Sequence, residues 1–498
     1  MKQITNDALR LKLSQEYRNA HFTWVFTALF TLLFLLYSFD FATQQVRVPV
    51  VVFLIVYAGT TLYVLFLAKR IKQDILTKRG VQKRTRLFAY PLLLTILVGN
   101  IFAAGFAFVL ANRHHHPEYT FASYAFLTQL FIIGVAAFNL FKPYVVDTFV
   151  LAMGLLILMA IFYGGMIVLT AKFVTVENAP RWMVFPGIFL LLSLFIGNFF
   201  AVLLGYSLLK KTLSTNPSSI EKWHSMWLKI TRNTMAIFGM FFITFIFSLS
   251  VVSEFVFDYD FATQNNYSAI LQSPSLLYPL GTDDFGRDLF SRIVFGAQIS
   301  LIVGFASTVI PFLIGGTLGA ISGYFGRTTD SVIMRLLDVL YAIPGILLAI
   351  AIIAAFGANT VNLIIALSVG AIPTYARTMR ATVMQLSNYE FVEAARALGA
   401  SDASIIFKQI VPNALAPMIV KATLTIGGAV IATSSLSFLG LGIEPHIPEW
   451  GNILKVGSTY LETHSYVAIF PGICIMLLVL SFNFFGDGLR DALDPKTN

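Results

Sequence analysis

The chain has 498 residues, of which 57% are hydrophobic and only 12% are charged. Soluble domains carry about 25% charged residues, so this composition excludes a soluble globular protein and indicates a polytopic membrane protein. The single cysteine, Cys474, excludes an internal disulfide and a cysteine metal cluster. The net charge of +9 does not indicate nucleic-acid binding, because the basic residues are concentrated in short loops between apolar runs.

The apolar runs predict the membrane spans, since a spanning helix needs about 20 mostly apolar residues. In the first half the candidates are 22–39, 48–68, 88–111, 122–141, 147–170 and 183–208. In the second half they are 233–253, 296–323, 338–356, 361–384, 415–440 and 465–485. The first run is expected to be a membrane span and not a cleaved signal peptide, because no small-x-small cleavage site follows it. The sequence therefore predicts an all-α polytopic membrane protein with about twelve transmembrane helices. Charged residues inside the runs are few.

The loop charges predict the orientation. Basic residues are dense before the first run, in loop 69–87 and in segment 209–232. Alternate loops carry few of them: Arg47 alone, Arg113 alone, then Lys172 and Arg181. By the positive-inside rule the basic loops and both termini are expected in the cytoplasm, and the alternate loops outside.

The polar stretch 209–232 divides the chain into a membrane domain of about six spans (1–208), a cytoplasmic linker (209–232) and a second membrane domain (233–498). The second part of the linker mixes tryptophan with lysine, which is typical of an interfacial helix, although an ordinary connector fits equally well. The sequence Asp-Phe-Ala-Thr-Gln occurs at 40–44 and again at 260–264, after the first span of each half. It is either a duplicated external contact or a coincidence.

Residues 388–412 are too polar to span a bilayer and too regular to be a plain loop. Four apolar residues recur at the spacing of one helix face: Phe391, Ala394, Ala395 and Leu398. Gly399 can take the left-handed conformation that ends a helix. Ser401 is a good N-cap for a second helix, which Pro412 is expected to stop. The segment is either a peg for a partner protein or an amphipathic helix on the membrane surface.

A family resemblance rests on motifs spread over the second half. They are Leu280–Asp288 with Ser291-Arg292, Gly323–Gly326, Asp338 with Ala342–Pro344, segment 388–412, and Phe438–Gly442 followed by Pro448–Asn452. Through them residues from about 230 to 495 resemble the permease subunit of the dipeptide/oligopeptide/nickel class of ABC importers, often called the C-type permease. The first 210 residues resemble nothing in that family.

The resemblance implies a six-span type I importer core behind a six-span N-terminal extension, with two functional sites. The first is the cytoplasmic coupling loop 388–412 that docks on an ATPase, with Glu390, Glu393, Ala394, Ala395, Gly399, Ile410 and Pro412 as its key residues. The second is an external motif that faces the substrate-binding protein, with Gly281, Thr282, Asp283, Gly286, Arg287 and Asp288.

The resemblance also implies the partners and the cargo. A second permease subunit, two ATPase subunits and an extracellular or periplasmic substrate-binding protein are expected, in the cytoplasmic membrane of a prokaryote. Peptides are the expected cargo, with nickel or nickel chelates as the alternative. The chain is not expected to be an enzyme or to hold a cofactor, since it has no P-loop sequence and its partners would bind ATP.

Other interpretations remain open from the residues alone. A secondary transporter would fit twelve spans but not the coupling loop. The extension could be a structural addition, a sensor or a scaffold. His114, His115 and His116 could bind a metal, but consecutive histidines rarely face one ion, so a solvated external loop is favoured. Asp283, Asp284 and Asp288 in the predicted external segment lack the alternating ligand spacing of a calcium loop, so no metal is expected there.

Overall fold

The computed structural model describes residues 10–494, apart from 12–13, 41–44, 47, 79, 112–115, 177 and 215. The described elements are helical except for one antiparallel pair of short strands, β1 (Phe39–Asp40) and β2 (Gln45–Val46). The predicted all-α class is confirmed. The chain divides into unit 1, Met1–Gly134 with Gly154–Ile237, and unit 2, Val135–Met153 with Phe238–Asn498. The second copy of the repeated pentapeptide forms α12 (Asp260–Thr263), whereas most of the first copy lies outside the described residues.

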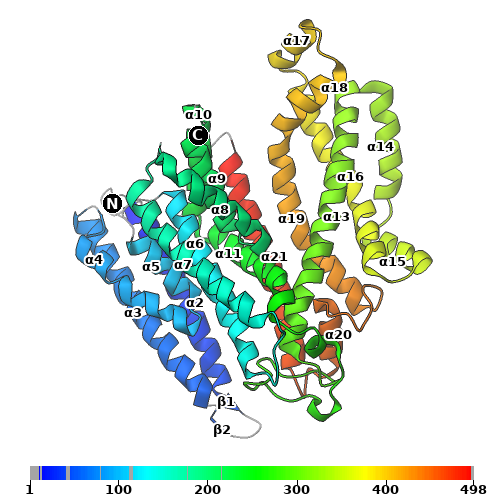
Figure 1. The fold of residues 1–498 in the computed structure, drawn as a ribbon. Helices are drawn as coiled ribbons and strands as arrows, with labels where there is room; N and C mark the ends of the chain where they lie inside the picture. The colour runs from blue at the N-terminus through cyan, green and yellow to red at the C-terminus, as the bar shows by residue number, and fades with distance from the viewer. Residues whose placement is uncertain are drawn as a thin grey trace, which may run out of the picture. The chain divides into compact units, whose positions relative to one another are not determined.

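Four long apolar helices belong wholly or largely to unit 1. They are α2 (Gln15–Tyr37), α3 (Val48–Lys78), α6 (Pro117–Ala137) and α7 (Phe149–Phe173). Figure 1 shows the short helix α4 (Lys83–Leu87) and the β1–β2 pair at opposite ends of α2 and α3. The linker contains the amphipathic helix α10 (Pro217–Arg232), so the second part of the segment is helical.

Two of the predicted spans, 88–111 and 183–208, are each broken by a Gly-Asn pair. The elements on either side are η1 (Tyr90–Val98) and α5 (Ile101–Ala111) in the first run, and η3 (Arg181–Met183), α8 (Val184–Leu191), η4 (Leu192–Ile196) and α9 (Phe199–Leu213) in the second. Gly99 and Gly197 have φ angles of +72° and +77°, which glycine adopts without steric cost. The asparagine after each glycine accepts a hydrogen bond from a backbone N–H of the next helix.

Each broken run folds back as a hairpin. Arg86, just before η1, donates a hydrogen bond of 3.0 Å to the carbonyl oxygen of Leu110, near the end of α5. In the second hairpin a Cβ on Gly205 of α9 would lie 2.7 Å from the carbonyl oxygen of Gly187 in α8, so the two legs touch through glycines. Both hairpins therefore begin and end at the same side of unit 1.

The predicted number of twelve spans is not confirmed. Among the described residues eight helices are long and apolar enough to cross a membrane. There are nine if α14 (Arg327–Tyr341) and α15 (Gly345–Phe356), bent by 80°, are counted as one broken span. The two hairpins explain part of the difference, because hydropathy detects apolar content and not the direction of the chain.

Unit 1 contains the same order of elements twice, which the sequence analysis did not detect. Two long helices are followed by a hairpin with a Gly-Asn tip, first as α2, α3 and η1–α5, then as α6, α7 and α8–α9. A Glu-Tyr pair stands near the start of each first helix. Both glutamates form ion pairs with a basic residue next to or within the hairpin, Glu16 with Arg86 at 3.1 Å and Glu118 with Lys211 at 2.8 Å. This order indicates an internal duplication.

The contacts of Lys211 correct part of the predicted topology. Its Nζ pairs with Glu118 and also donates a 2.8 Å hydrogen bond to the carbonyl oxygen of Thr175. Glu118 at the start of α6 and Thr175 just after α7 therefore lie at the same end of unit 1 as Lys211, and neither residue can be external if the linker is cytoplasmic. Lys172 and Arg181, which the sequence assigned to alternate loops, then strengthen the charge bias of that side, whereas Arg113 lies outside the described residues.

Unit 2 is built around the 37-residue helix α13 (Leu289–Phe325). The other long helices are α11 (Thr234–Val256), α16 (Thr360–Leu386), α19 (Val411–Phe438) and α21 (Tyr466–Leu493). Along α13 small residues allow close packing on α16: a Cβ on Gly315 would lie 2.6 Å from the carbonyl oxygen of Ile372. Figure 1 shows α17 (Glu390–Ala397) near one end of α13 and α20 (Trp450–Thr459) near the other.

Cysteine labelling distinguishes the topology with two hairpins from one with twelve full spans. In a Cys474→Ser background, Asn178→Cys and Thr77→Cys should both resist a membrane-impermeant thiol reagent in intact cells, whereas Asp147→Cys should react. The reason is that α7 carries the chain back to the side of loop 69–87 before the second hairpin begins. All three positions are exposed, so burial does not explain a difference in labelling. Rapid labelling of Asn178→Cys would contradict the hairpin topology.

Candidate functional site

The predicted coupling loop consists of two short helices joined at a glycine, as expected. The first is α17, and Gly399 follows it with a φ angle of +77°. The N–H groups of Gly399 and Ala400 bond back to the carbonyl oxygens of Arg396 and Ala395, which closes the helix end. Ser401 caps the next helix, α18 (Asp402–Ser404), by accepting a hydrogen bond from the N–H of Ser404.

The prediction that Pro412 ends the second helix is wrong. After α18 the chain forms a π-helical turn, η6 (Ile405–Ile410), and continues directly into α19. Pro412 lies in the first turn of α19, where a missing N–H group is tolerated because the local hydrogen-bond pattern is already changing. Residues Asp402–Phe438 thus form one continuous helical segment, so a displacement of the loop is carried directly into a membrane helix.

The base of the loop is anchored in a hydrophobic cluster of unit 2. Val392, Ile405 and Ile410 are fully buried there, together with Tyr375 and Met379 of α16. Ala395 packs against the same cluster. Because both halves of the loop contribute to it, the loop is held as a rigid projection.

The tip of the loop faces outward. Glu390, Glu393 and Ala394 are exposed, and the side chain of Leu398 is 88% exposed. The predicted apolar face is therefore only half packed, since Leu398 does not join the cluster. An exposed leucine between exposed charges is a feature that a partner protein can cover.

The motif Gly323–Gly326 holds the loop to the end of α13. The hydroxyl of Tyr324 donates a 2.6 Å hydrogen bond to Asp402, and Arg396 donates a 3.3 Å bond to the same hydroxyl oxygen. Tyr324 thereby connects α13 to both short helices of the loop. This contact gives the motif a role that the sequence alone did not show.

At the opposite end of α13 the external motif forms a buried turn. The Oδ1 atom of Asp283 accepts hydrogen bonds from the backbone N–H groups of Phe285 and Arg287, at 3.0 and 2.9 Å. Its Oδ2 atom pairs with the guanidinium groups of Arg287 at 2.8 Å and Arg292 at 3.4 Å. The carboxylate is therefore the organising centre of the turn.

The remaining residues of the motif have equally local roles. Asp288 is the N-cap of α13 and accepts from the N–H of Ser291 at 2.9 Å. Thr282 accepts from the N–H of Gln272 at 2.8 Å. Gly281 and Gly286 have φ angles of +83° and +72°, and neighbouring atoms leave no space for a Cβ at either position.

The carboxylate of Asp288 has a partner that the sequence analysis missed. Lys142, between α6 and α7, places its Nζ 2.9 Å from Asp288 Oδ2, and both side chains are almost fully buried. Burial lowers the pKa of Lys142, an effect that the charge of Asp288 opposes. No spacing rule could have found this pair, because its members are far apart in the chain.

The motif Pro448–Asn452 supports the same end of α13. The indole Nε1 of buried Trp450 donates a 2.9 Å hydrogen bond to the carbonyl oxygen of Ile293. Glu449 caps α20 through the N–H of Asn452, at 3.0 Å. Burial raises the pKa of the Glu449 carboxyl.

Three charged contacts lie along the long helices of unit 2. Arg377 pairs with Asp338 and Arg380 pairs with Asp330, each at 2.5 Å, and both pairs join α16 to α14. Lys421 of α19 donates a 2.9 Å hydrogen bond to the carbonyl oxygen of Thr374, beside Pro373 in α16. Charges inside membrane helices usually face a helix bundle or an aqueous cavity. The sequence did not predict these three contacts, because charged residues inside its apolar runs are few.

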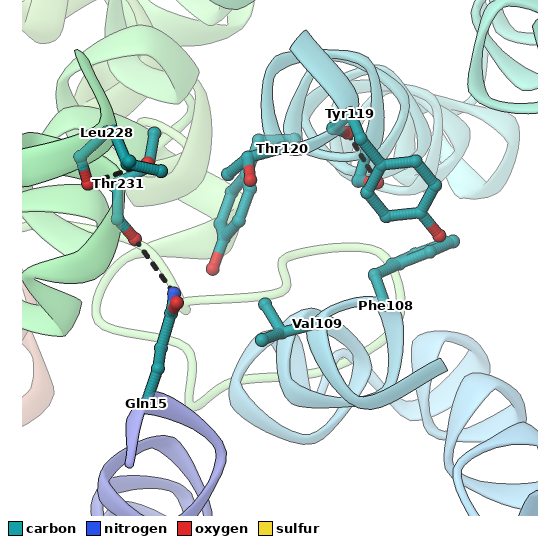
Figure 2. A pocket seen from close by; sticks show the side chains of 9 residues that line it. Gln15, Phe108, Val109, Tyr119, Thr120, Leu228 and Thr231 are labelled. Atoms are coloured by element: carbon teal, nitrogen blue, oxygen red, sulfur yellow. Dashed lines mark hydrogen bonds between the residues drawn. The ribbon is translucent and has the colours of Figure 1, made fainter. Parts of the chain in front are cut away.

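Unit 1 contains a separate pocket (Figure 2). It is lined by Gln15, Phe108, Val109, Tyr119, Thr120, Ser123, Tyr124, Leu228 and Thr231. Gln15 donates a 3.4 Å hydrogen bond to the carbonyl oxygen of Thr231 at its edge. No residue predicted to be functional lines it. Within the described residues no group of three His, Cys, Asp or Glu side chains could hold a metal ion, and His114 and His115 lie outside them.

Known families match the second half of the chain. Residues 315–498 match the model of the family described as binding-protein-dependent transport system inner membrane component. Residues 222–274 match the N-terminal TM domain of oligopeptide transport permease C. Together with the relatives below, these matches show that the chain belongs to the ABC importer permeases of the C-type class.

Individual relatives agree with that class. The chain is 43% identical over 279 residues to the dipeptide transport system permease protein DppC of Alkalihalophilus pseudofirmus, which covers 56% of this chain and 91% of the relative. It is 39% identical over 292 residues to the glutathione transport system permease protein GsiD of Pectobacterium atrosepticum, covering 58% and 97%. It is 42% identical over 274 residues to GsiD of Escherichia coli O6:K15:H31, covering 55% and 90%.

The turn of the external motif can be tested at a glycine. Gly286→Ala should destabilise the protein by about 1–3 kcal/mol from its left-handed backbone alone, and by more because the new Cβ would overlap the carbonyl oxygen of Asn266. Gly357→Ala is the matched control, since Gly357 also has a positive φ, +93°, but no atom lies within 4 Å of its Cβ position. Thermal unfolding in detergent measures both. Equal melting temperatures for the two variants would contradict the packing described for the motif.

Proposed function

We propose that this chain is one of two permease subunits of a binding-protein-dependent ABC importer for peptides, in the cytoplasmic membrane of a prokaryote. The observation that carries the proposal is the projection formed by residues 388–412. Its apolar base is buried, its tip exposes Leu398, and its second helix continues into α19. A partner that moves this projection also moves α19 and, through Tyr324, α13.

The proposed partner at the projection is an ATPase subunit. Glu390 and Glu393 supply exposed acceptors beside the apolar tip, and Gly399 provides the sharp turn between the two helices. In this proposal ATP is bound and hydrolysed by two such partners, and the chain itself holds no cofactor. Both termini are then cytoplasmic, on the same side as the projection.

A second permease subunit is the proposed partner along the membrane helices. The ion pair of Arg377 with Asp338 is only partly covered, with side chains 41% and 56% exposed. Such a pair is unfavourable against lipid, so it supports a face that meets a second subunit around a hydrated pathway. The substrate-binding protein is proposed to dock outside, on the region of the external motif.

Peptides are the proposed cargo because the names of two relatives specify dipeptide and glutathione transport. Both are short peptides, with a free amino group, at least one free carboxylate and at least one amide bond. Uptake of a radiolabelled dipeptide mixture by proteoliposomes that contain the complete importer tests this choice directly. Uptake of nickel without uptake of any peptide would overturn it.

Leu398→Ala tests the coupling loop without disturbing the fold. Because the side chain is 88% exposed, its removal should leave the melting temperature of the isolated chain unchanged. It should weaken ATPase binding about five- to tenfold, the effect of losing an apolar contact of about 1–1.4 kcal/mol at an interface. Phe356→Ala, another exposed apolar residue, is the control and should bind the ATPase normally. Normal ATPase affinity of Leu398→Ala would contradict docking at this tip.

Gly399→Val tests the geometry of the loop. A β-branched residue is strained at a φ of +77°, so the turn should distort while the membrane helices stay folded. Substrate uptake by the reconstituted complex should fall at least tenfold, or ATP hydrolysis should continue without uptake. Glu393→Ala should give a milder loss, about 1–3 kcal/mol if its contact is a charged hydrogen bond. Fully coupled uptake by Gly399→Val would refute the assignment.

A further inference from the structure

A short segment of the N-terminal half belongs to unit 2, the unit that contains the helices of the permease. Residues 135–153, which connect α6 to α7, are grouped with Phe238–Asn498 and not with their neighbours in sequence. They lie outside both regions matched by family models. Asn139 donates a 3.1 Å hydrogen bond to the carbonyl oxygen of Val256, and Thr148 donates a 2.8 Å bond to that of Phe255. The segment is thus held at two points near the end of α11.

Between these points Lys142 enters a closed site. Its Nζ lies 2.9 Å from Asp288 Oδ2 and 4.9 Å from the ring centres of Phe261 and Tyr278. The side chains of Lys142 and Asp288 are 1% and 0% exposed. Next to it, the ring of Tyr144 stacks on that of Phe261 at 4.9 Å. Such enclosure is unfavourable for a lone charge, so each member of the ion pair depends on the other.

The position of Asp288 gives the pair its significance. Asp288 is the N-cap of α13, the helix whose other end contacts the coupling loop through Tyr324. The neighbouring cations of the motif, Arg287 and Arg292, form their ion pairs with Asp283. Lys142 is therefore the cation that forms an ion pair with Asp288 at this end of α13.

We propose that Lys142 is a positioning residue of the transporter, which fixes the N-terminus of α13 by holding Asp288 in place. The segment 139–148 then acts as a brace that the extension contributes to the outer surface of the permease. The extension is in this view a required part of the permease unit and not a separable domain. The inference goes beyond the proposed function and does not depend on which substrate is carried.

Hydrogen exchange of the full chain in lipid nanodiscs tests the brace. In Lys142→Met, peptides that cover residues 282–296 should exchange at least tenfold faster than in the wild type, because the N-cap of α13 loses its fixed geometry. Peptides from the other end of α13 should be unchanged. Lys142→Arg should restore much of the protection, since it keeps the charge. Lys172→Met, which removes an exposed lysine, is the matched control and should exchange like the wild type.

The double variant Lys142→Met with Asp288→Asn keeps the test decisive if the single variant folds poorly. Without the carboxylate no buried charge is left unpaired, so folding should recover, while protection at 289–293 should stay below that of the wild type because Lys142 no longer fixes the position of residue 288. Wild-type protection of residues 282–296 in Lys142→Met would overturn the proposal. So would Lys142→Arg behaving like Lys142→Met, because the charge would then be irrelevant.

A cut at the end of the linker tests whether the extension is a required part. A protease site inserted at Asn233, between α10 and α11, leaves α10 on the N-terminal fragment and allows the folded chain to be cleaved in detergent. An affinity tag on the C-terminal fragment then captures that fragment together with whatever remains bound to it. The N-terminal fragment should remain bound in the wild type and in Lys172→Met. Its retained fraction should fall at least threefold in Lys142→Met. Loss of the N-terminal fragment from the wild type would refute the brace.

Discussion

The long helix α13 depends on the way its two ends are held. Its 37 residues span unit 2, and at each end a side chain fixes a polar contact that the helix itself cannot satisfy. Asp288 caps the N-terminus, where free backbone N–H groups would otherwise lack partners. Tyr324 near the C-terminus connects the helix to the loop at 388–412. A helix fixed at both ends transmits force along its axis, which is the property an energised transporter needs.

Close packing extends this rigidity across unit 2. Gly315 of α13 leaves no room for a Cβ against α16, and Trp450 donates to the backbone of α13 near the other end. Contacts of this kind involve backbone atoms, which cannot move aside as a flexible side chain can. Since lipid does not drive helices together, such geometric fit is a main source of helix association in membranes.

Local chemistry could be predicted from the sequence, whereas direction and distant pairing could not. Gly399 and Ser401 act on their nearest neighbours, and both have the predicted conformations. Pro412 does not stop the helix as predicted, because the π-helical turn before it changes the hydrogen-bond pattern that a proline would break. The hairpins cannot be told from full spans by hydropathy, because a Gly-Asn pair hardly lowers the mean hydropathy of an apolar run. The partnership of Lys142 with Asp288 depends on the tertiary fold, and no periodicity encodes it.

The hairpins of unit 1 also have a consequence for how such a chain can grow. Two crossings followed by a hairpin return the polypeptide to the side from which it started. Such a module does not change the membrane orientation of the segments that follow it. It can therefore be placed before a permease, or copied in tandem, without inverting the permease. The repeated order of elements in unit 1 is what successive additions of that kind would leave behind. An added module with an odd number of crossings would invert the permease relative to the start of that module.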